Sequence, residues 1–415
     1  MKMLFIYYDR PNYYGGPIVN ARRLLPELRN RGHDVHCLIN YLGSEAPSAN
    51  YLSQQGVKCH LHPFDHYIEQ QIEWILHKVT EVQPDVFIPN LSVAGWFSSR
   101  WVRQAGIPTI AAHRNDDAFY WAMVDEFVTG DPEWAVSGLV CVSEHLYKTV
   151  KEKKPKYTKL CVIPSGVPVT NQLSDQTGPL RLVYVGRLVQ RAKRILDLID
   201  ALALVMRTRD DIIATLVGDG NELQTLQERI ESYSLEDRIR IIGTIPSEKI
   251  QTILAHHHVL VLLSDYEGTP GAVMDGMAAG LVPVCLDIPG GVRELVTHGE
   301  TGLLVKDRKQ DFVNAIGRLA NDNALRKKLA TNARSHIKKY YSLSVAADRW
   351  ETFCTELIRE SNNRIPLVIP SKYSLPPVRP GLKREDRRIG SVPRRVLRAL
   401  AHPFKRALTK VRLFY

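Results

Sequence analysis

Short apolar runs alternate with stretches in which apolar residues recur every three or four positions along residues 1–360. The apolar runs are rich in β-branched residues and are typical of buried strands, whereas the longer spacing predicts amphipathic helices. In the first half we predict strands at 3–8, 34–39, 57–61, 85–89, 107–112, 139–142 and 159–163. Helices are predicted in the intervals, notably at 17–31, 67–82, 92–105 and 144–152. This alternation indicates a parallel sheet that helices cover on both faces.

A Pro-containing polar stretch at 165–179 interrupts the pattern and is the best candidate for a linker. The alternation then starts again, with strands predicted at 181–185, 212–217, 238–242, 259–263, 282–286 and 302–305. Helices are predicted at 195–208, 221–232, 246–256, 270–279 and 308–320. We therefore expect an α/β protein with two doubly wound domains, 1–164 and 180–340. A cleft between them would lie at the carboxyl ends of both sheets.

The net charge of +11 is unevenly distributed along the chain. Residues 361–415 contain 14 Lys or Arg and 2 Asp or Glu, a charge of +12, and residues 1–360 carry only −1. A nucleic-acid-binding domain more often carries basic charge on its folded surface, so we expect no nucleic-acid partner. The six cysteines are scattered without a CxxC pair, which favours reduced core residues over disulfides or zinc ligands.

Neither a signal peptide nor a membrane span is expected in this sequence. The apolar part of the first ten residues is too short for a signal peptide and fits a buried strand. No apolar run approaches the roughly 18 residues that cross a bilayer. We therefore expect a cytoplasmic protein.

The segment after the apolar run 259–263 carries the strongest chemical signal. An acidic, glycine-containing loop follows the run, and Pro270 is well placed to begin a helix because its missing N–H costs nothing there. The first N–H groups of that helix would lack partners inside it, and with the helix dipole they would bind an anion such as a phosphate. These groups belong to Gly271, Ala272 and Val273.

Two carboxylates flank this predicted phosphate site. Glu267 lies in the loop and Asp275 lies inside the helix. Ionised carboxylates only accept hydrogen bonds, so hydroxyl-rich groups are their natural ligands. A phosphate site between two such acids matches the phosphate and hydroxyl groups of a nucleotide sugar. The alternative is that Asp275 is simply a solvated residue on a helix that packs on a sheet.

A second signal is Tyr184-Val-Gly-Arg-Leu, with Lys193 downstream. Gly186 at the end of a strand lets a ligand approach the backbone. Arg187 and Lys193 would supply positive charge, the first as a planar fork for phosphate oxygens and the second as a compact charge. The alternative is a solvated helix start.

The first domain offers two further candidates. Gly15 and Gly16 precede a helix that Pro17 can begin, and they permit a close approach of the backbone to a ligand. His113 ends a predicted strand and should project into the cleft, unless it only caps the following helix. The run 256–258 consists of three histidines, which point in different directions and cannot share one face, so we expect no metal site.

In this order, the motifs resemble those of the group 1 (family 4) retaining glycosyltransferases, which have the GT-B fold. The resemblance covers roughly residues 3–360 and includes a Gly-Gly-x-x-Glu continuation at Gly290, Gly291 and Glu294. It implies two facing Rossmann-like domains, with a terminal helix at 341–360 that crosses back onto the first. The absence of a strict Asp-x-Asp weighs against the metal-dependent GT-A class.

This sequence departs from the family pattern at two positions. Asp275 replaces the second acid of the Glu-x7-Glu signature and is one methylene shorter. Arg194 stands where a glycine usually follows the lysine.

The resemblance also implies roles for the site residues. Glu267 and His113 would lie beside the donor sugar, and Asp275 would hold the ribose hydroxyls. Arg187 and Lys193 would neutralise the diphosphate. The glycine-rich first loop would lie against the donor phosphate or the acceptor.

The expected reaction moves a hexosyl unit from a nucleoside-diphosphate sugar to an acceptor hydroxyl, with retention and without metal or cofactor. The acceptor would be a lipid-linked or cell-surface glycan. Two alternatives stay open at this point, namely a nucleotide-sugar epimerase of the GT-B fold and a catalytically weak nucleotide-sugar-binding protein.

The tail, residues 361–415, has two parts. Residues 361–391 are rich in Pro, Arg and Ser and are expected to be extended or disordered. In 392–415, apolar residues recur at steps of three or four among Arg and Lys, which suits an anionic membrane surface. The protein could then lie at the inner face of the cytoplasmic membrane. The alternative is a solvated tail that binds nothing.

Overall fold

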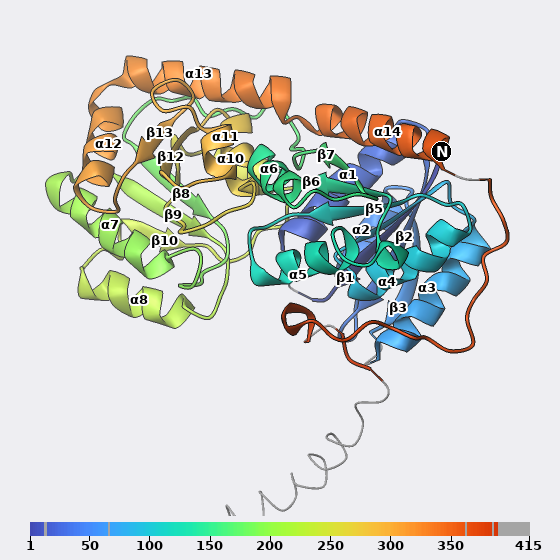
Figure 1. The fold of residues 1–415 in the computed structure, drawn as a ribbon. Coiled ribbons are helices and arrows are strands. Elements are labelled where there is room, and N and C mark those ends of the chain that lie inside the picture. Colours follow the sequence, from blue (N-terminus) through green and yellow to red (C-terminus); the bar gives the residue numbers. More distant parts are fainter. Residues whose placement is uncertain (12–14, 65–66, 362, 384–385, 389–415) are drawn as a thin grey trace, which may run out of the picture.

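The computed structural model describes residues 1–11, 15–64, 67–361, 363–383 and 386–388, which form two lobes (Figure 1). The first lobe contains a parallel sheet of seven strands in the order β3-β2-β1-β4-β5-β6-β7. Its strands are β1 (Lys2–Asp9), β2 (Asp34–Tyr41), β3 (Lys58–Pro63), β4 (Val86–Asn90), β5 (Thr109–His113), β6 (Gly138–Cys141) and β7 (Lys159–Val162). The strand order reverses between β1 and β4, and such reversals open a crevice for ligands at the carboxyl ends of the strands.

The second lobe contains a parallel sheet of six strands in the order β10-β9-β8-β11-β12-β13. Its strands are β8 (Arg181–Val185), β9 (Ile213–Val217), β10 (Ile239–Ile241), β11 (Val259–Leu262), β12 (Val282–Leu286) and β13 (Leu303–Val305). Every residue of β11 and β12 is buried, as expected for strands that helices cover on both faces. The predicted α/β class with two doubly wound sheets is confirmed.

Helices connect the strands at the predicted places. Those of the first lobe are α1 (Gly16–Asn30), α2 (Pro47–Gln54), α3 (Ile68–Val82), α4 (Val93–Gln104), α5 (Ala118–Phe127) and α6 (Glu144–Glu152). Those of the second are α7 (Ile195–Thr208), α8 (Leu223–Ser232), α9 (Ile250–Leu254), α10 (Gly271–Ala278), α11 (Gly291–Leu295), α12 (Gln310–Asn321) and α13 (Asn323–Tyr340). Short 3-10 turns occupy Pro132–Trp134 and Pro380–Leu382. Among the described helices, none combines the length and apolar character that a bilayer crossing requires.

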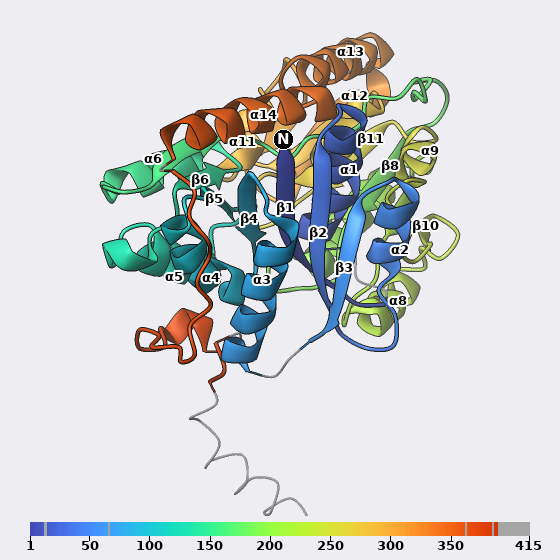
Figure 2. The same cartoon turned by 90° about the vertical axis from the view of Figure 1, so that its right-hand side faces the viewer.

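Two apolar clusters cover the two faces of the first sheet. Residues of α3 and α4 belong to one cluster, and residues of α1 and α2 belong to the other, on the opposite side in Figure 2. The second lobe has one cluster that runs from β8 to the end of α13. Each lobe therefore has its own hydrophobic core.

The last helix, α14 (Leu343–Glu360), returns from the second lobe to the first (Figure 1). Its Trp350 is 3% exposed and packs edge-on against Phe5, with ring centroids 6.3 Å apart. The returning chain runs beside the outgoing one. The Val167 N–H donates to the Tyr341 carbonyl at 3.1 Å, and the Leu343 N–H donates to the Val167 carbonyl at 2.9 Å. The two connections between the lobes are therefore joined to each other.

Residues 363–383 and 386–388, which we call the C-terminal strap, lie along the first lobe. The strap is extended, as predicted, but the expectation of disorder is wrong for these residues. Leu382 is 1% exposed and belongs to the core cluster of α3 and α4. The Ile365 N–H donates to the Ala105 carbonyl at 3.2 Å, and Arg379 forms an ion pair with the buried Glu126. The apolar residues of the strap are irregularly spaced and pack individually against the first lobe. Their spacing has no strand or helix period, so the sequence pattern did not indicate their burial.

We expect Leu382→Ala to lower the free energy of unfolding by about 2–4 kcal/mol, because it leaves a cavity in a packed core. Val368→Ala is the matched control in the same strap, since Val368 is 74% exposed. The control should change stability by less than about 0.5 kcal/mol. Urea unfolding of both variants measures the difference, and equal stabilities would show that the strap does not support the first lobe.

Candidate functional site

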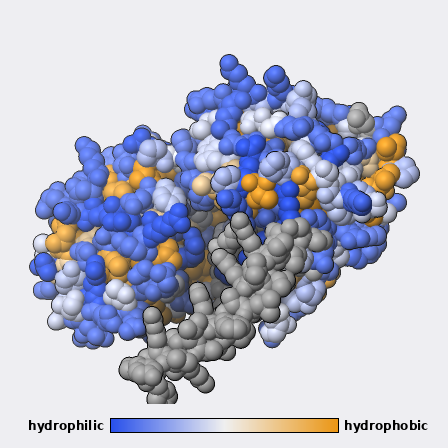
Figure 3. Space-filling view, turned by 60° about the horizontal axis from the view of Figure 1, so that its bottom comes forward, coloured by the Kyte–Doolittle hydropathy of each residue, from blue (hydrophilic) through white to orange (hydrophobic). Residues whose placement is uncertain are grey.

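Loops that follow strands of the two sheets meet at the junction of the lobes, as the close approach of Gly268 to the Arg114 carbonyl shows, and Figure 3 presents the two lobes in space-filling form. The loop after β11 enters this junction and leads into α10. Pro270, the predicted first residue of this helix, is the N-cap residue of α10, so the helix begins one position later than predicted. The Val273 N–H donates to the Pro270 carbonyl at 3.0 Å, so the expectation that it is unpaired is wrong. Gly271 and Ala272 keep N–H groups without a backbone acceptor in the described part of the chain.

Glu267 and Lys193, which are 74 residues apart, meet in this junction. Lys193 Nζ lies 2.5 Å from Glu267 Oε1, and the two side chains are 18% and 11% exposed. Because both are largely shielded from water, their attraction is stronger than that of a surface ion pair. The structure therefore brings together two predicted site residues as a neutral pair.

Arg187 differs from Lys193 in having its charge exposed. No ion pair of Arg187 occurs among the described residues, and its carbonyl accepts a hydrogen bond from the Tyr184 hydroxyl at 2.8 Å. Gly186 precedes it, and the backbone there is crowded. A Cβ on Gly218 would lie 1.9 Å from the Gly186 carbonyl oxygen, so Gly218 must be glycine for the two strand ends to meet.

Arg194 adopts a left-handed backbone conformation. Its φ of 51° lies in the left-handed region, which glycine adopts without strain. The Arg194 guanidinium turns away from Glu267 and pairs with Asp197 and, at 3.6 Å, with Asp265. Lys193 is therefore the cation that faces Glu267.

Asp275 is buried and is bound by a residue that the sequence motifs did not reveal. Arg23 of α1 lies 3.1 Å from its carboxylate, and the side chains are 11% and 9% exposed. The Gln251 amide also approaches the carboxylate, at 3.5 Å. Burial raises the pKa of Asp275 and Arg23 opposes that shift. The oxygen atoms expected to accept ribose hydroxyls thus bind a cation from the other lobe.

His113 ends β5 as predicted, but its side chain is 0% exposed. The Trp121 ring packs against it at a centroid distance of 4.7 Å, and Tyr120 packs at 5.6 Å. Both ring nitrogens are buried without hydrogen-bond partners. Burial lowers the pKa of His113 to about 4, so the imidazole is neutral at pH 7. A sugar can reach the imidazole only if a side chain packed against it, such as Trp121, moves.

The glycines at the start of α1 leave open space. Gly15 is the N-cap residue of α1, and its carbonyl accepts hydrogen bonds from Ile18 and Val19, both at 3.1 Å. A Cβ added to Gly16 would meet no atom of the described residues within 4 Å, so packing against them does not require glycine there. The position has room for a ligand.

Other contacts hold the two lobes together around this junction. The Glu294 carboxylate of α11 accepts hydrogen bonds from the backbone N–H groups of Glu144 and His145, at 2.9 and 2.8 Å. These groups begin α6 in the first lobe, so Glu294 caps a helix of the other lobe. A Cβ on Gly268 would lie 2.2 Å from the carbonyl oxygen of Arg114, which follows β5. The loop that carries Glu267 therefore rests directly on the first lobe.

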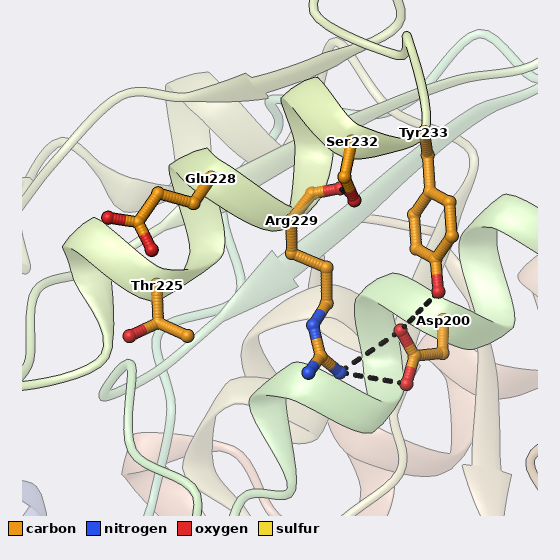
Figure 4. A pocket seen from close by; sticks show the side chains of 6 residues that line it. All are labelled: Asp200, Thr225, Glu228, Arg229, Ser232 and Tyr233. Carbon is orange, nitrogen blue, oxygen red and sulfur yellow. Dashed lines mark hydrogen bonds and ion pairs between the residues drawn. The ribbon is translucent and has the colours of Figure 1, made fainter.

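A separate pocket lies between α7 and α8 (Figure 4). Its lining residues are Asp200, Thr225, Glu228, Arg229, Ser232 and Tyr233. Arg229 and the Tyr233 hydroxyl both bind Asp200, at 2.9 and 3.0 Å, so these polar groups satisfy one another. None of the predicted site residues lines this pocket. Within the described residues, no group of three or more His, Cys, Asp or Glu side chains is arranged to hold a metal ion.

Comparison with known proteins finds a family match in the second lobe. Residues 170–336 match the model of the family described as "Glycosyl transferases group 1". Curated relatives include N-acetyl-alpha-D-glucosaminyl L-malate synthase of Bacillus anthracis, 28% identical over 42% of this chain and 45% of that protein. Another is alpha-D-kanosaminyltransferase of Streptomyces kanamyceticus, 31% identical over 40% of this chain and 43% of that protein. The chain therefore spans less than half the length of these relatives.

Solved structures show the same GT-B fold over both lobes. Anabaena Alr3699/HepE in complex with UDP-glucose has a TM-score of 0.69 at 19% identity, covering 86% of this chain and 100% of that one. The pneumococcal O-GlcNAc transferase GtfA in complex with UDP and GlcNAc has a TM-score of 0.71 at 10% identity, covering 86% and 99%.

The buried His113 predicts a pH dependence of stability. Its pKa falls from the ordinary 6.5 to about 4 in the folded chain, so between these values the unfolded chain binds more protons. Acidification from pH 6.5 towards pH 4 therefore favours unfolding through this residue. We expect His113→Gln to lose less stability than the native protein between pH 7 and pH 5.

Urea midpoints at the two pH values measure this effect, with His77→Gln on the exposed face of α3 as control. If His113→Gln and the native protein lost the same stability on acidification, the imidazole would not be the group that titrates.

Proposed function

We propose that this chain, whose residues 170–336 belong to the group 1 glycosyltransferases, transfers a hexosyl unit from a nucleoside-diphosphate sugar to an acceptor hydroxyl, with retention of configuration. The meeting of Lys193 and Glu267 beside the start of α10 carries the proposal, because it gathers a cation, a carboxylate and free backbone donors in one place. The solved structures of similar fold that contain UDP or UDP-glucose support a nucleotide sugar as donor.

The donor diphosphate would bind between Arg187, Lys193 and the N–H groups of Gly271 and Ala272. Arg187 is exposed, and Lys193 can exchange Glu267 for a phosphate oxygen. Negative charge grows on the diphosphate as the glycosidic bond breaks, and donors fixed beforehand stabilise it in the transition state. This is the main contribution we assign to the protein.

Glu267, released from Lys193, would accept hydrogen bonds from the sugar hydroxyls, and neutral His113 would orient the sugar once Trp121 moves. Asp275 would hold the ribose. We assign no covalent nucleophile. The acceptor hydroxyl would attack on the face from which the diphosphate leaves and pass its proton to the departing phosphate. We propose no metal in this reaction.

A panel of nucleotide sugars, incubated with the full-length protein, tests the function. Transfer to an added glycan or lipid-linked acceptor, or slow hydrolysis of one donor, supports the proposal. Epimerised nucleotide sugar would instead identify an epimerase. Thermal stabilisation by a nucleotide sugar without any turnover would identify a binding protein.

We expect Arg187→Ala and Lys193→Ala to lower turnover by about 10²–10³-fold, the typical loss when one transition-state donor is removed. Arg187→Ala should leave the melting temperature nearly unchanged, because its side chain is exposed and forms no ion pair among the described residues. Lys193→Ala should lower the melting temperature as well as turnover, because it leaves Glu267 without its partner in a shielded place. Lys328→Ala, an exposed cation on α13, is the control and should keep full turnover. If either site variant kept near-normal turnover with an authentic donor, the substituted residue would not be a contact of the diphosphate.

The ribose role of Asp275 can be isolated with a modified ligand. The native protein should bind a nucleoside diphosphate at least ten-fold more tightly than its 2′,3′-dideoxy analogue, a difference of about 1.4 kcal/mol. In Asp275→Asn this preference should shrink towards one, because the amide has one acceptor oxygen and no negative charge, where the carboxylate has two acceptor oxygens. Calorimetric titration gives both ratios, and an unchanged preference would assign the ribose to another residue.

We also propose that residues 392–415, which lie outside the described residues, bind an anionic membrane surface and bring the protein to a lipid-linked acceptor. Each basic residue near such a surface contributes about 1 kcal/mol. Because the strap is part of the first lobe, the informative truncation removes only 391–415. Salt-sensitive binding to vesicles that contain phosphatidylglycerol should vanish in this truncation while nucleotide binding persists. Equal vesicle binding by the full-length and truncated proteins would favour the alternative, a solvated tail that does not bind membranes.

A further inference from the structure

Arg114, directly after β5, carries a charge that no acid neutralises. Its Nε donates to the Asn90 side-chain oxygen at 3.0 Å, and its Nη2 donates to the Asn20 side-chain oxygen at 3.2 Å. No carboxylate lies within ion-pair distance of Arg114 among the described residues. Two other arginines of this junction, Arg22 and Arg23, pair with Glu248 at 2.8 Å and Asp275 at 3.1 Å. Arg114 is thus a half-buried cation that two neutral amides hold in place.

Asn90 provides a second, independent sign of a missing ligand. The residue is 1% exposed and its φ is 45°, an uncommon conformation for a residue other than glycine. Its oxygen binds Arg114, but its amide nitrogen is buried without a partner. A buried donor left unpaired costs about 1–3 kcal/mol, so such groups normally have a partner in the working protein.

The location of this pair fits a binding site. Asn90 ends β4, at the point where the strand order of the first sheet reverses beside β1. Ligands of doubly wound sheets bind at the carboxyl ends of the strands at such a reversal. The Arg114 carbonyl touches Gly268, the residue next to Glu267. Arg114 therefore lies in the first lobe, beside the place proposed for the sugar.

The groups that Arg114 and Asn90 leave available for a ligand are all hydrogen-bond donors. A guanidinium has five N–H groups and no acceptor, and the Asn90 amide nitrogen also only donates. Oxygen atoms of a phosphate or a carboxylate satisfy such a set, whereas a neutral hydroxyl needs an acceptor as well. From this geometry we propose that Arg114 and Asn90, supported by Asn20, form a subsite for an anionic group, a phosphate or a carboxylate, that the acceptor carries near its reacting hydroxyl. This proposal rests on the proposed glycosyl transfer.

Thermal-shift titrations of the full-length protein test the subsite, with inorganic phosphate and acetate as probes and chloride at equal ionic strength as the reference. The titrations run with and without a saturating nucleoside diphosphate, which occupies the donor site. We expect the native protein to gain about 2 °C or more from one probe at ten times its dissociation constant, in addition to the nucleotide's own effect. The probe that acts distinguishes phosphate from carboxylate.

Arg114→Met should lose the response to the probe but keep the response to the nucleotide. Arg114→Lys should keep part of the response to the probe, because it keeps the charge. Arg22→Met is the matched control, since its charge is already neutralised by Glu248, and its response to the probe should be unchanged. If Arg114→Met does not fold, Arg114→Gln, which retains an amide donor for the two asparagines, replaces it.

Three results would overturn the proposal. A native protein that responds to neither probe has no anion subsite. A response that survives in Arg114→Met places the anion elsewhere. Loss of the nucleotide response in Arg114→Met would assign the residue to the donor diphosphate. The proposed function fails separately, if no nucleotide sugar is bound or turned over by the native protein.

Discussion

The arrangement of the site depends on a close approach between three backbone segments that only glycine permits. A Cβ on Gly268 would collide with the Arg114 carbonyl of the first lobe, and a Cβ on Gly291 would lie 1.8 Å from the Gly268 carbonyl. The loop with Glu267 is therefore clamped between the end of β5 and the start of α11. This contact sets the distance between the two sheets, and the pairs Lys193–Glu267 and Arg23–Asp275 form within that distance.

The free site is electrically balanced by its own side chains. Lys193 neutralises Glu267, and Arg23 neutralises Asp275. A nucleotide sugar would have to replace both partners, offering a diphosphate to the lysine and hydroxyl groups to the acids. A ligand that offers only one of these groups leaves a charge unpaired in a shielded place, which is costly. Selectivity for a complete nucleotide sugar over free phosphate or free sugar would follow from this balance.

The sequence pattern predicted the sheets well because parallel strands that are covered on both faces are apolar throughout, as in β11 and β12. It also placed His113 at the end of a strand and Glu267 in the loop between a strand and a helix. Pairings between distant residues were beyond its reach. Arg23 is one of several basic residues on α1, and nothing in its local pattern marks it as the partner of Asp275, 252 residues away. The burial of Leu382 was missed for a related reason, since a single apolar residue in a Pro-rich segment has no periodicity.

The joined connections between the lobes constrain how the two lobes can move apart. The chain passes from one lobe to the other twice, and Val167 ties the two passages together through its hydrogen bonds to Tyr341 and Leu343. A Cβ on Gly166 would lie 2.7 Å from the Leu343 Cα, so the passages are also in tight contact. A single connection would allow the lobes to rotate about several axes. Two connections that are bonded side by side restrict the motion to a hinge at that point. Opening of the junction is then a rotation of one lobe about the axis of the paired connections. On closure, the facing surfaces of the two lobes return to the same relative position.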